Sequence, residues 1–274
     1  DSARRNWGRL AIADSSGREL KYGELLIASL ILRNRIRSLT SKSDQSIGII
    51  LPTSSASAMA NLAITLDGRR GVNLNYTASA ASFGSAQEQC EIGTVVTSRK
   101  FLERLPELPL PQNALYMEDL LASIGASEKF RSFLKARFSP VRLLMGGKKV
   151  APDDIATVLF SSGSTAEPKG VMLSHHNLQS NMESFRAVIN LKRDDVILAT
   201  LPFFHSFGYT VLFWFPLLSG IKSICHTNPL EAETIGKVSE KYKASILLTT
   251  PSFLLAYVRK IKPCLLYTSD AADE

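Results

Sequence analysis

The sequence has 274 residues, of which 45% are hydrophobic and 8% are aromatic. This length suits one large domain or two packed subdomains, and the composition is ordinary for a soluble globular protein. The 32 basic and 25 acidic residues give a formal net charge of +7, which favours an acidic partner such as a nucleotide, an acidic protein or an anionic lipid.

The basic residues are dispersed along the chain, and neither zinc-knuckle spacing nor an aromatic RNA-binding signature accompanies them. A nucleic-acid partner is therefore not expected. The three cysteines, Cys90, Cys225 and Cys264, are far apart and odd in number. They argue against a disulfide framework and for a reducing compartment.

The first half of the chain alternates between helical and strand patterns. Apolar residues at helical spacing follow Tyr22 as far as Leu39, and the run SIGIIL that follows is typical of a buried strand. The expected elements after Tyr22 are a helix over 22–39, strands at 46–51, 71–74, 94–97 and 113–117, and helices near 54–66, 79–91 and 99–105. This alternation predicts a parallel sheet with helices on its faces.

The region 118–152 has a weaker pattern and follows a proline-rich loop at 106–111. Within it, Phe130, Phe133, Leu134 and Phe138 have the spacing of one amphipathic helix.

The apolar run 155–160 leads into the most informative segment of the sequence. Residues 162–170 read SGSTAEPKG, which matches the pattern S-G-S-T-x-x-P-K-G. Glycine lets the backbone approach an anion, hydroxyls donate hydrogen bonds, and lysine adds a compact positive charge, so the segment has what polyphosphate binding needs. The alternative is a solvated Gly/Ser/Pro loop between two strands.

The second half returns to alternating elements. Residues 171–173 are expected to pair back as a strand, and Ser174 is expected to cap the helix that follows. Neighbouring His175 and His176 point in different directions on a helix, so they are not expected to share a metal ion. The remaining expected elements are strands at 196–201, 222–226 and 244–249, a helix at 231–242, and an apolar helix at 209–221 that is interrupted by Pro216 and too short to span a membrane.

A second motif strengthens the interpretation of the glycine-rich segment. Residues 201–208 read LPFFHSFG, and together the two motifs resemble the adenylate-forming (AMP-binding) superfamily, which includes acyl-CoA synthetases, acyl-carrier-protein synthetases, peptide-synthetase adenylation domains and luciferases. The resemblance implies an α/β fold: the large N-terminal domain of an adenylate-forming enzyme, incomplete here, with two βαβ-type subdomains of mixed or parallel sheets flanked by helices. We expect a partial AMP-binding domain over 1–263, subdomains near 1–150 and 151–263, and a non-native tail at 264–274.

The same resemblance implies ATP and Mg²⁺ as cofactors and assigns roles to particular residues. Lys169 and His205 are expected to be catalytic, and Ser161 is expected to help bind the metal ion. Ala166 stands where the family usually has glycine. The expected phosphate-binding residues are Ser161, Ser162, Gly163, Ser164, Thr165, Ala166, Lys169 and Gly170. The expected substrate pocket contains Phe204, His205, Phe207, Gly208, Thr250 and Pro251.

Three further segments narrow the resemblance. Residues 48–52, 73–78 and 96–102 are similar to the acyl-carrier-protein synthetase modules of bifunctional acylglycerophosphoethanolamine acyltransferases. This similarity implies a fatty acid and an acyl carrier protein as partners, with membrane or phospholipid association in the full-length protein. It also implies a cytoplasmic-side location with attachment to the inner membrane through a missing part of the chain.

Two alternatives stay open: a long-chain acyl-CoA synthetase, which would use coenzyme A, and a non-catalytic nucleotide- or lipid-binding homologue. A dinucleotide oxidoreductase is disfavoured, because no G-x-G-x-x-G follows a predicted strand.

The sequence begins at Asp1 and does not contain the family's Y-G-x-T-E segment, ribose-binding aspartate or C-terminal lysine. We therefore expect an internal piece of a longer protein and predict that these residues alone do not turn over substrate.

Overall fold

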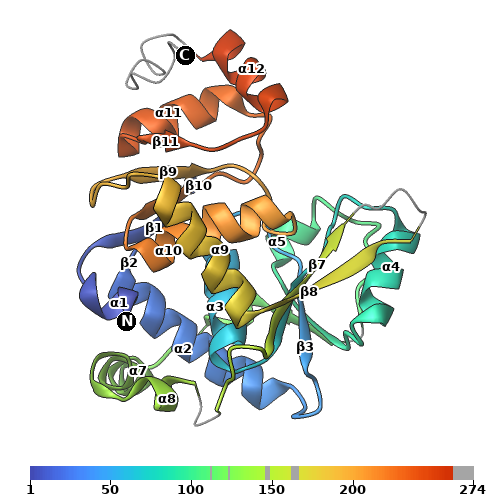
Figure 1. Ribbon diagram of the computed structural model, residues 1–274. Helices are drawn as coiled ribbons and strands as arrows, with labels where there is room; N and C mark the ends of the chain where they lie inside the picture. Colours follow the sequence, from blue (N-terminus) through green and yellow to red (C-terminus); the bar gives the residue numbers. More distant parts are fainter. Residues whose placement is uncertain (112, 123, 146–148, 162–166, 262–274) are drawn as a thin grey trace.

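The computed structural model describes residues 1–261 apart from positions 112, 123, 146–148 and 162–166. Its strands form two sheets with helices packed around them (Figure 1), which confirms the predicted α/β fold. The first sheet has the order β6-β5-β3-β4-β7-β8, and only the last pair is antiparallel. Its strands are β3 (Ser46–Ile49), β4 (Arg70–Asn73), β5 (Thr94–Thr97), β6 (Asn113–Tyr116), β7 (Ile155–Ser161) and β8 (Lys169–Ser174).

The second sheet has the order β11-β9-β10-β1-β2, in which the first four strands are parallel and β2 is antiparallel to β1. No strand was predicted for the segment that forms β1 and β2, although β1 lies in the interior of this sheet. Its strands are β1 (Leu10–Asp14), β2 (Glu19–Lys21), β9 (Val196–Ala199), β10 (Lys222–Cys225) and β11 (Ile246–Leu247).

Each sheet takes strands from both sides of residue 150. β7 and β8 join the first sheet, whereas β1 and β2 join the second. Sheet membership therefore does not follow the expected division of the chain near that residue. One hydrophobic cluster contains Ile12 and Ile197 of the second sheet, Ile47 of the first, and Leu32 of the helix between them in the sequence, so the two sheets share a core.

Serine side chains set the start of several helices. Ser54, Ser79 and Ser174 each accept a hydrogen bond from the backbone N–H three residues later, which satisfies a donor that the helix itself cannot pair. The predicted cap at Ser174 is confirmed. The helices are α1 (Ser2–Arg5), α2 (Tyr22–Leu39), α3 (Ser55–Leu66), α4 (Ala80–Gln89), α5 (Arg99–Leu102), α6 (Met117–Leu120), α7 (Ala126–Phe138), α8 (Val141–Leu144), α9 (His175–Val188), α10 (Phe215–Ser219), α11 (Ala232–Tyr242) and α12 (Pro251–Lys260), with a π-helix, η1, at Gly208–Trp214.

The predicted helix over 209–221 is two helices, η1 and α10. Pro216 lies in the first turn of α10, where its fixed φ suits a helical start. Phe213, Trp214 and Phe215 are buried and belong to the hydrophobic core. Among the residues that the structure describes, no helix combines the length and the apolar character that crossing a bilayer requires.

Helix α7 forms where it was predicted, but most of its large apolar side chains face away from the core. Only Phe133 packs inward, with its ring centroid 5.9 Å from that of Trp7. Phe130, Leu134 and Phe138 are exposed, whereas the small residues Ser132 and Ala136 are buried. The periodicity therefore located the helix without giving its orientation.

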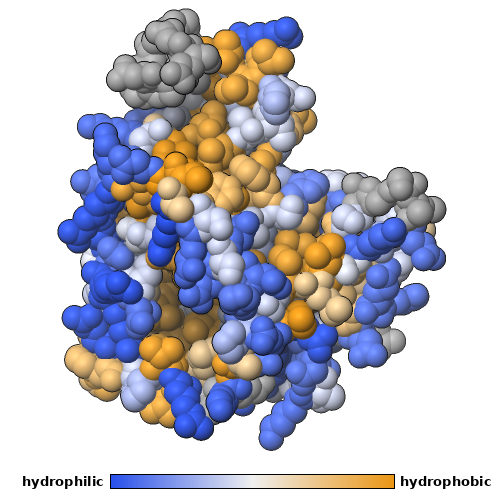
Figure 2. Space-filling view, viewed as in Figure 1, coloured by the Kyte–Doolittle hydropathy of each residue, from blue (hydrophilic) through white to orange (hydrophobic). Residues whose placement is uncertain are grey.

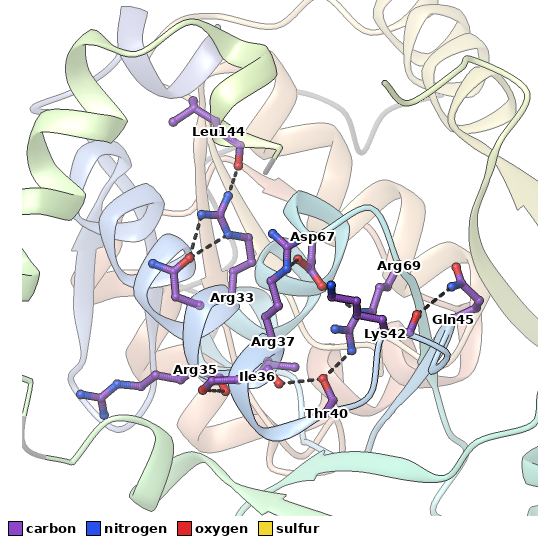
Figure 3. Close-up of polar contacts among 12 residues, drawn as sticks. Arg33, Arg35, Ile36, Arg37, Thr40, Lys42, Gln45, Asp67, Arg69 and Leu144 are labelled. Carbon is purple, nitrogen blue, oxygen red and sulfur yellow. Dashed lines mark hydrogen bonds and ion pairs between the residues drawn. The ribbon is translucent and has the colours of Figure 1, made fainter. Parts of the chain in front are cut away.

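A buried ion cluster joins α2 to the turn between α3 and β4 (Figure 3). Asp67 is 3% exposed and lies 2.7 Å from the Nε of Arg69 and 3.6 Å from the Nε of Arg37. Arg33 is also buried and donates to the carbonyl of Leu144 and to the side chain of Asn34. Burial lowers the pKa of Arg33, while the charge of Asp67 opposes that shift. One carboxylate thus balances several guanidinium groups in this part of the fold.

Candidate active site

The glycine-rich segment connects the two strands of an antiparallel hairpin. Ser161 at the end of β7 is the register partner of Lys169 at the start of β8, and both are exposed. Because directly opposed residues of an antiparallel pair point to the same face, a hydroxyl and an ammonium group flank the loop on one side. The predicted phosphate-binding residues Ser162, Gly163, Ser164, Thr165 and Ala166 lie outside the described residues.

The loop end of this hairpin is held to a neighbouring helix. Gln89, at the end of α4, donates from its Nε2 to the carbonyl oxygen of Pro168 at 2.9 Å. Figure 1 shows the hairpin running out beside α4. This hydrogen bond positions the backbone directly before Lys169.

Gly170 has a packing role that the sequence motif did not indicate. A Cβ at this position would lie 3.1 Å from both the Phe160 ring and the Cγ1 of Val158. The missing side chain leaves room for Phe160, the register partner of Gly170 across the hairpin. The expected contact of Gly170 with phosphate stays a prediction.

His205 lies in the segment that leaves the carboxyl end of β9. Its backbone N–H donates to the carbonyl of Pro202 at 3.1 Å, and its own carbonyl accepts from the N–H of Tyr209 at 2.9 Å. The residue is exposed, and its ring lies 4.5 Å, centroid to centroid, from the buried ring of Phe204. Partial burial lowers the pKa of His205, so the neutral imidazole is favoured, which can both accept and donate a hydrogen bond.

Gly208 allows a very close approach of two backbone segments. A Cβ there would lie 2.1 Å from the carbonyl oxygen of Pro202 and 3.0 Å from that of Leu201. These are backbone atoms, which cannot rotate away from a clash. Gly208 therefore allows η1 to start directly against the segment that presents His205. Single-turn π-helical segments occur frequently at functional sites.

Tyr76 supports the same segment and was not among the predicted site residues. Its ring makes edge-to-face contacts with Phe204 and Phe101, each with centroids 4.9 Å apart. Burial raises the pKa of Tyr76 to about 12, so its hydroxyl stays protonated. The segment 73–78, which resembles the family, contains Tyr76, but its contact with Phe204 is a tertiary feature that no motif spacing reveals.

A buried hydrogen bond also connects this segment to the first sheet. Thr53, which follows β3, is 1% exposed and donates from its Oγ1 to the carbonyl of Leu201 at 3.0 Å. Both Thr53 and Tyr76 follow strands of the first sheet, whereas Leu201 and Phe204 follow β9 of the second. The site thus forms where the carboxyl ends of strands from the two sheets meet.

Phe207 lines a pocket of about 350 Å³ between α9 and η1. Apolar side chains of Leu178, Phe185 and Val211 form part of its wall, and Asn181 and Thr210 supply polar groups. The pocket is large enough for a small acyl group or part of a longer one.

Thr250 and Pro251 begin the helix that follows β11. Thr250 is the N-cap of α12 and Pro251 is its first residue, and the N–H of Leu254 donates to the Thr250 carbonyl at 3.0 Å. Because β11 is parallel to β9, these residues leave the sheet at the same edge as the His205 segment. Open α/β sheets bind ligands at this edge.

The structure therefore brings some predicted residues together and leaves others apart. Phe204, His205, Phe207 and Gly208 form one continuous segment. In the described part of the chain, no hydrogen bond, ion pair or ring contact joins Lys169 to His205. A ligand that contacts both residues would have to extend from the hairpin to this segment.

The described residues provide little for a metal ion by themselves. Among them, no group of three or more His, Cys, Asp and Glu side chains could hold one. Magnesium usually keeps several waters and binds one or two protein ligands plus substrate phosphates. The hydroxyl of Ser161 fits such a minor ligand, and its role in binding Mg²⁺ stays a prediction.

Two helix-flanked mixed sheets of this topology define the N-terminal domain of an adenylate-forming enzyme. The sequence model of the family described as "AMP-binding enzyme" matches residues 1–271, and the chain belongs to this family. The match extends into the segment 264–274 that was expected to be a non-native tail; that segment lies outside the described residues.

Among curated relatives, the chain is 29% identical over 262 residues to "4-coumarate--CoA ligase-like 9" of Arabidopsis thaliana, covering 90% of this chain and 43% of the relative. It is 27% identical over 155 residues to "Long-chain-fatty-acid--CoA ligase" of Bacillus subtilis, covering 54% and 28%. The chain thus spans less than half the length of these relatives.

A solved structure of O-succinylbenzoate coenzyme A synthetase from Bacillus subtilis in complex with AMP superposes with a TM-score of 0.78 at 17% identity, covering 96% of this chain and 64% of that one. The same enzyme in complex with ATP and magnesium ion gives a TM-score of 0.76 at 18% identity, covering 96% and 66%. At these identities the superpositions establish the fold of this chain.

Proposed function

We propose that the full-length protein activates a long-chain fatty acid as an acyl-adenylate with ATP and transfers the acyl group to the thiol of an acyl carrier protein. One observation carries the first step: Ser161 and Lys169 pair across the hairpin on either side of a loop whose sequence is suited to polyphosphate. Membership of the AMP-binding enzyme family supports the same chemistry.

The proposed reaction makes a poor acyl donor reactive. A carboxylate oxygen attacks the α-phosphorus of ATP, the bond to the β-phosphate oxygen breaks, and pyrophosphate leaves. A thiolate then attacks the carbonyl carbon of the acyl-adenylate, a thioester forms, and AMP leaves. Negative charge on the phosphates is greatest while pyrophosphate departs, so fixed positive groups and hydrogen-bond donors accelerate this step.

The residues of this chain have distinct proposed roles. Lys169 would hold the leaving phosphates by its charge, and Ser161 would donate to them or contact the magnesium ion. Bound magnesium supplies charge neutralisation of the phosphates. The neutral ring of His205 would orient the substrate carboxylate by a hydrogen bond, and Phe207 and Thr250 would line the acyl side of the site.

Two thiols are candidates for the acceptor of the acyl group. Residues 48–52, 73–78 and 96–102 resemble acyl-carrier-protein synthetase modules, which favours the carrier protein. The names of the relatives favour coenzyme A instead, since both reported above are described as CoA ligases. Coenzyme A is therefore the second candidate acceptor for the same activated acid.

Two assays of the full-length protein test this proposal. Fatty-acid-dependent exchange of pyrophosphate into ATP should be observed without any thiol, and its absence across acids of different length would contradict the ligase chemistry and favour a non-catalytic homologue. Thioester formation should then be faster with the carrier protein than with coenzyme A at equal concentration. Faster transfer to coenzyme A would contradict the carrier assignment and leave the first step intact.

A further inference from the structure

The surface of α7 and α8 carries an unusual concentration of exposed apolar side chains. Phe130 is 60% exposed, Phe138 is 70% exposed and Leu143 is 58% exposed. Figure 2 shows hydrophobic residues at the lower left, where α7 and α8 lie in Figure 1. Scattered exposed apolar residues are ordinary, but a contiguous group indicates an interaction site. We call this group the α7–α8 apolar face; it consists of Phe130, Leu134, Phe138, Val141 and Leu143.

The geometry of α7 directs this face to solvent. Phe130, Leu134 and Phe138 follow one another at intervals of four residues, so each is rotated by only about 40° from the previous one around the helix. The buried residues Ser132 and Ala136 lie two residues away from members of this stripe, about 160° to the opposite side. The apolar stripe therefore lies opposite the face that packs on the protein.

Basic residues accompany the apolar face. Between Ala126 and Leu144 the sequence contains five basic residues and one acidic residue. The single acidic residue, Glu128, is already paired with Arg35 at 2.9 Å. The net charge on the solvent-facing side of residues 126–144 is therefore positive. The five basic residues are Lys129, Arg131, Lys135, Arg137 and Arg142.

The helix is firmly attached to the rest of the fold. Arg4 donates to the carbonyl of Ala136 at 2.8 Å and to the carbonyl of Ser139, where α7 ends. The ring of Trp7 contacts Phe133 on the inner side, and the guanidinium of Arg137 lies 5.3 Å above that Trp7 ring. The apolar face is therefore presented on a fixed support.

We propose that the α7–α8 apolar face docks the protein on an anionic lipid bilayer. Exposed aromatic and aliphatic side chains would enter the interfacial region, while the flanking lysine and arginine side chains would contact lipid phosphates. The positive local charge favours binding to an anionic surface over a neutral one. The outward apolar stripe favours a bilayer, whose interior is apolar, over a purely polar partner. This role does not rest on the proposed ligase chemistry.

Vesicle cosedimentation of the full-length protein tests the proposal. The probes are vesicles of phosphatidylcholine alone and vesicles of phosphatidylcholine and phosphatidylglycerol in equal parts. We expect binding to the anionic vesicles only, with loss at high salt. Reversing two charges with Arg131→Glu and Lys135→Glu should weaken this binding roughly tenfold or more. Replacing two apolar contacts with Phe130→Ser and Phe138→Ser should weaken it by a similar factor.

Matched controls come from exposed residues elsewhere. Val188→Ser on α9 and the double reversal Lys192→Glu with Arg193→Glu before β9 should leave vesicle binding unchanged, since these residues are exposed and lie outside the face. Thermal unfolding checks that each variant is folded. Three results would overturn the proposal: no binding of the unchanged protein to either vesicle, equal binding by the face variants, or binding of an acidic protein or a second copy at this face without vesicle binding.

Discussion

A methyl group at position 208 should disrupt the site without touching any predicted ligand-binding side chain. In Gly208→Ala, the added Cβ would lie 2.1 Å from the Pro202 carbonyl oxygen, whereas ordinary contact begins at 3.4 Å. The start of η1 and the Pro202 segment must therefore separate by about 1.3 Å. Because the clashing atoms belong to the backbone, no side-chain rotation can relieve the overlap.

The substitution is expected to lower both the folding stability and the reaction rate. Overpacking of this kind destabilises a fold by about 1–3 kcal/mol. A displacement of about 1 Å at a reacting group can lower a rate about 100-fold, which is equivalent to about 2.7 kcal/mol of transition-state free energy. His205 lies between Pro202 and Gly208, so we expect the activity loss to exceed what reduced folding explains.

The assay is fatty-acid-dependent ATP–pyrophosphate exchange by the full-length protein, with thermal unfolding measured on the same samples. Gly84→Ala is the matched control, because Gly84 lies inside α4 and a Cβ there would meet nothing within 4 Å. That variant should be active and more stable by about 0.5–1 kcal/mol. Wild-type exchange by folded Gly208→Ala would refute the inference that this close approach positions His205.

Four other predictions concern the hairpin, the aromatic support, the ion cluster and pH. Lys169→Ala should lower kcat/KM for ATP by an amount equivalent to about 1.5–3 kcal/mol; unchanged pyrophosphate exchange would contradict its role. Tyr76→Phe keeps both ring contacts and should preserve stability, whereas Tyr76→Ala should lower the free energy of unfolding by about 3–5 kcal/mol. Equal stability of the two variants would contradict the inference that the Tyr76 ring supports the Phe204 segment. Asp67→Asn should destabilise the protein by about 3–5 kcal/mol, because it leaves the buried guanidinium of Arg69 without its carboxylate. Asp194→Asn, at an exposed pair with Arg9, should cost less than about 1 kcal/mol, and denaturant titration distinguishes these results. Burial lowers the pKa of His175, His205 and His226 below the ordinary 6.5. The unfolded chain therefore binds more protons than the folded protein just below that pH, and the free energy of unfolding should fall from about pH 7 to about pH 5. His226→Gln should flatten this dependence, and an unchanged slope would exclude His226 as a contributor.

Local patterns in the sequence predicted much of the fold. β5 occupies the predicted residues Thr94–Thr97, and Ser174 caps α9 as its residue type predicts. These features depend on neighbouring residues only, since caps and strand runs are set by local hydrogen bonding and periodicity.

Features that depend on distant residues were not predictable in this way. β1 is short and owes its burial to pairing with β10, more than two hundred positions away. The outward orientation of Phe130 and Phe138 depends on which face of α7 the protein covers. Tyr76 supports the site only because two sheets bring it against Phe204. Motif spacing identified the hairpin and the His205 segment, but not the contacts that hold them.

The most direct test of the account is a crystal structure of the full-length protein with a non-hydrolysable ATP analogue and Mg²⁺. We predict that the β- and γ-phosphates lie against residues 161–170, with the Lys169 ammonium within hydrogen-bonding distance of a phosphate oxygen. A triphosphate bound elsewhere, with the hairpin contacting only solvent, would contradict it.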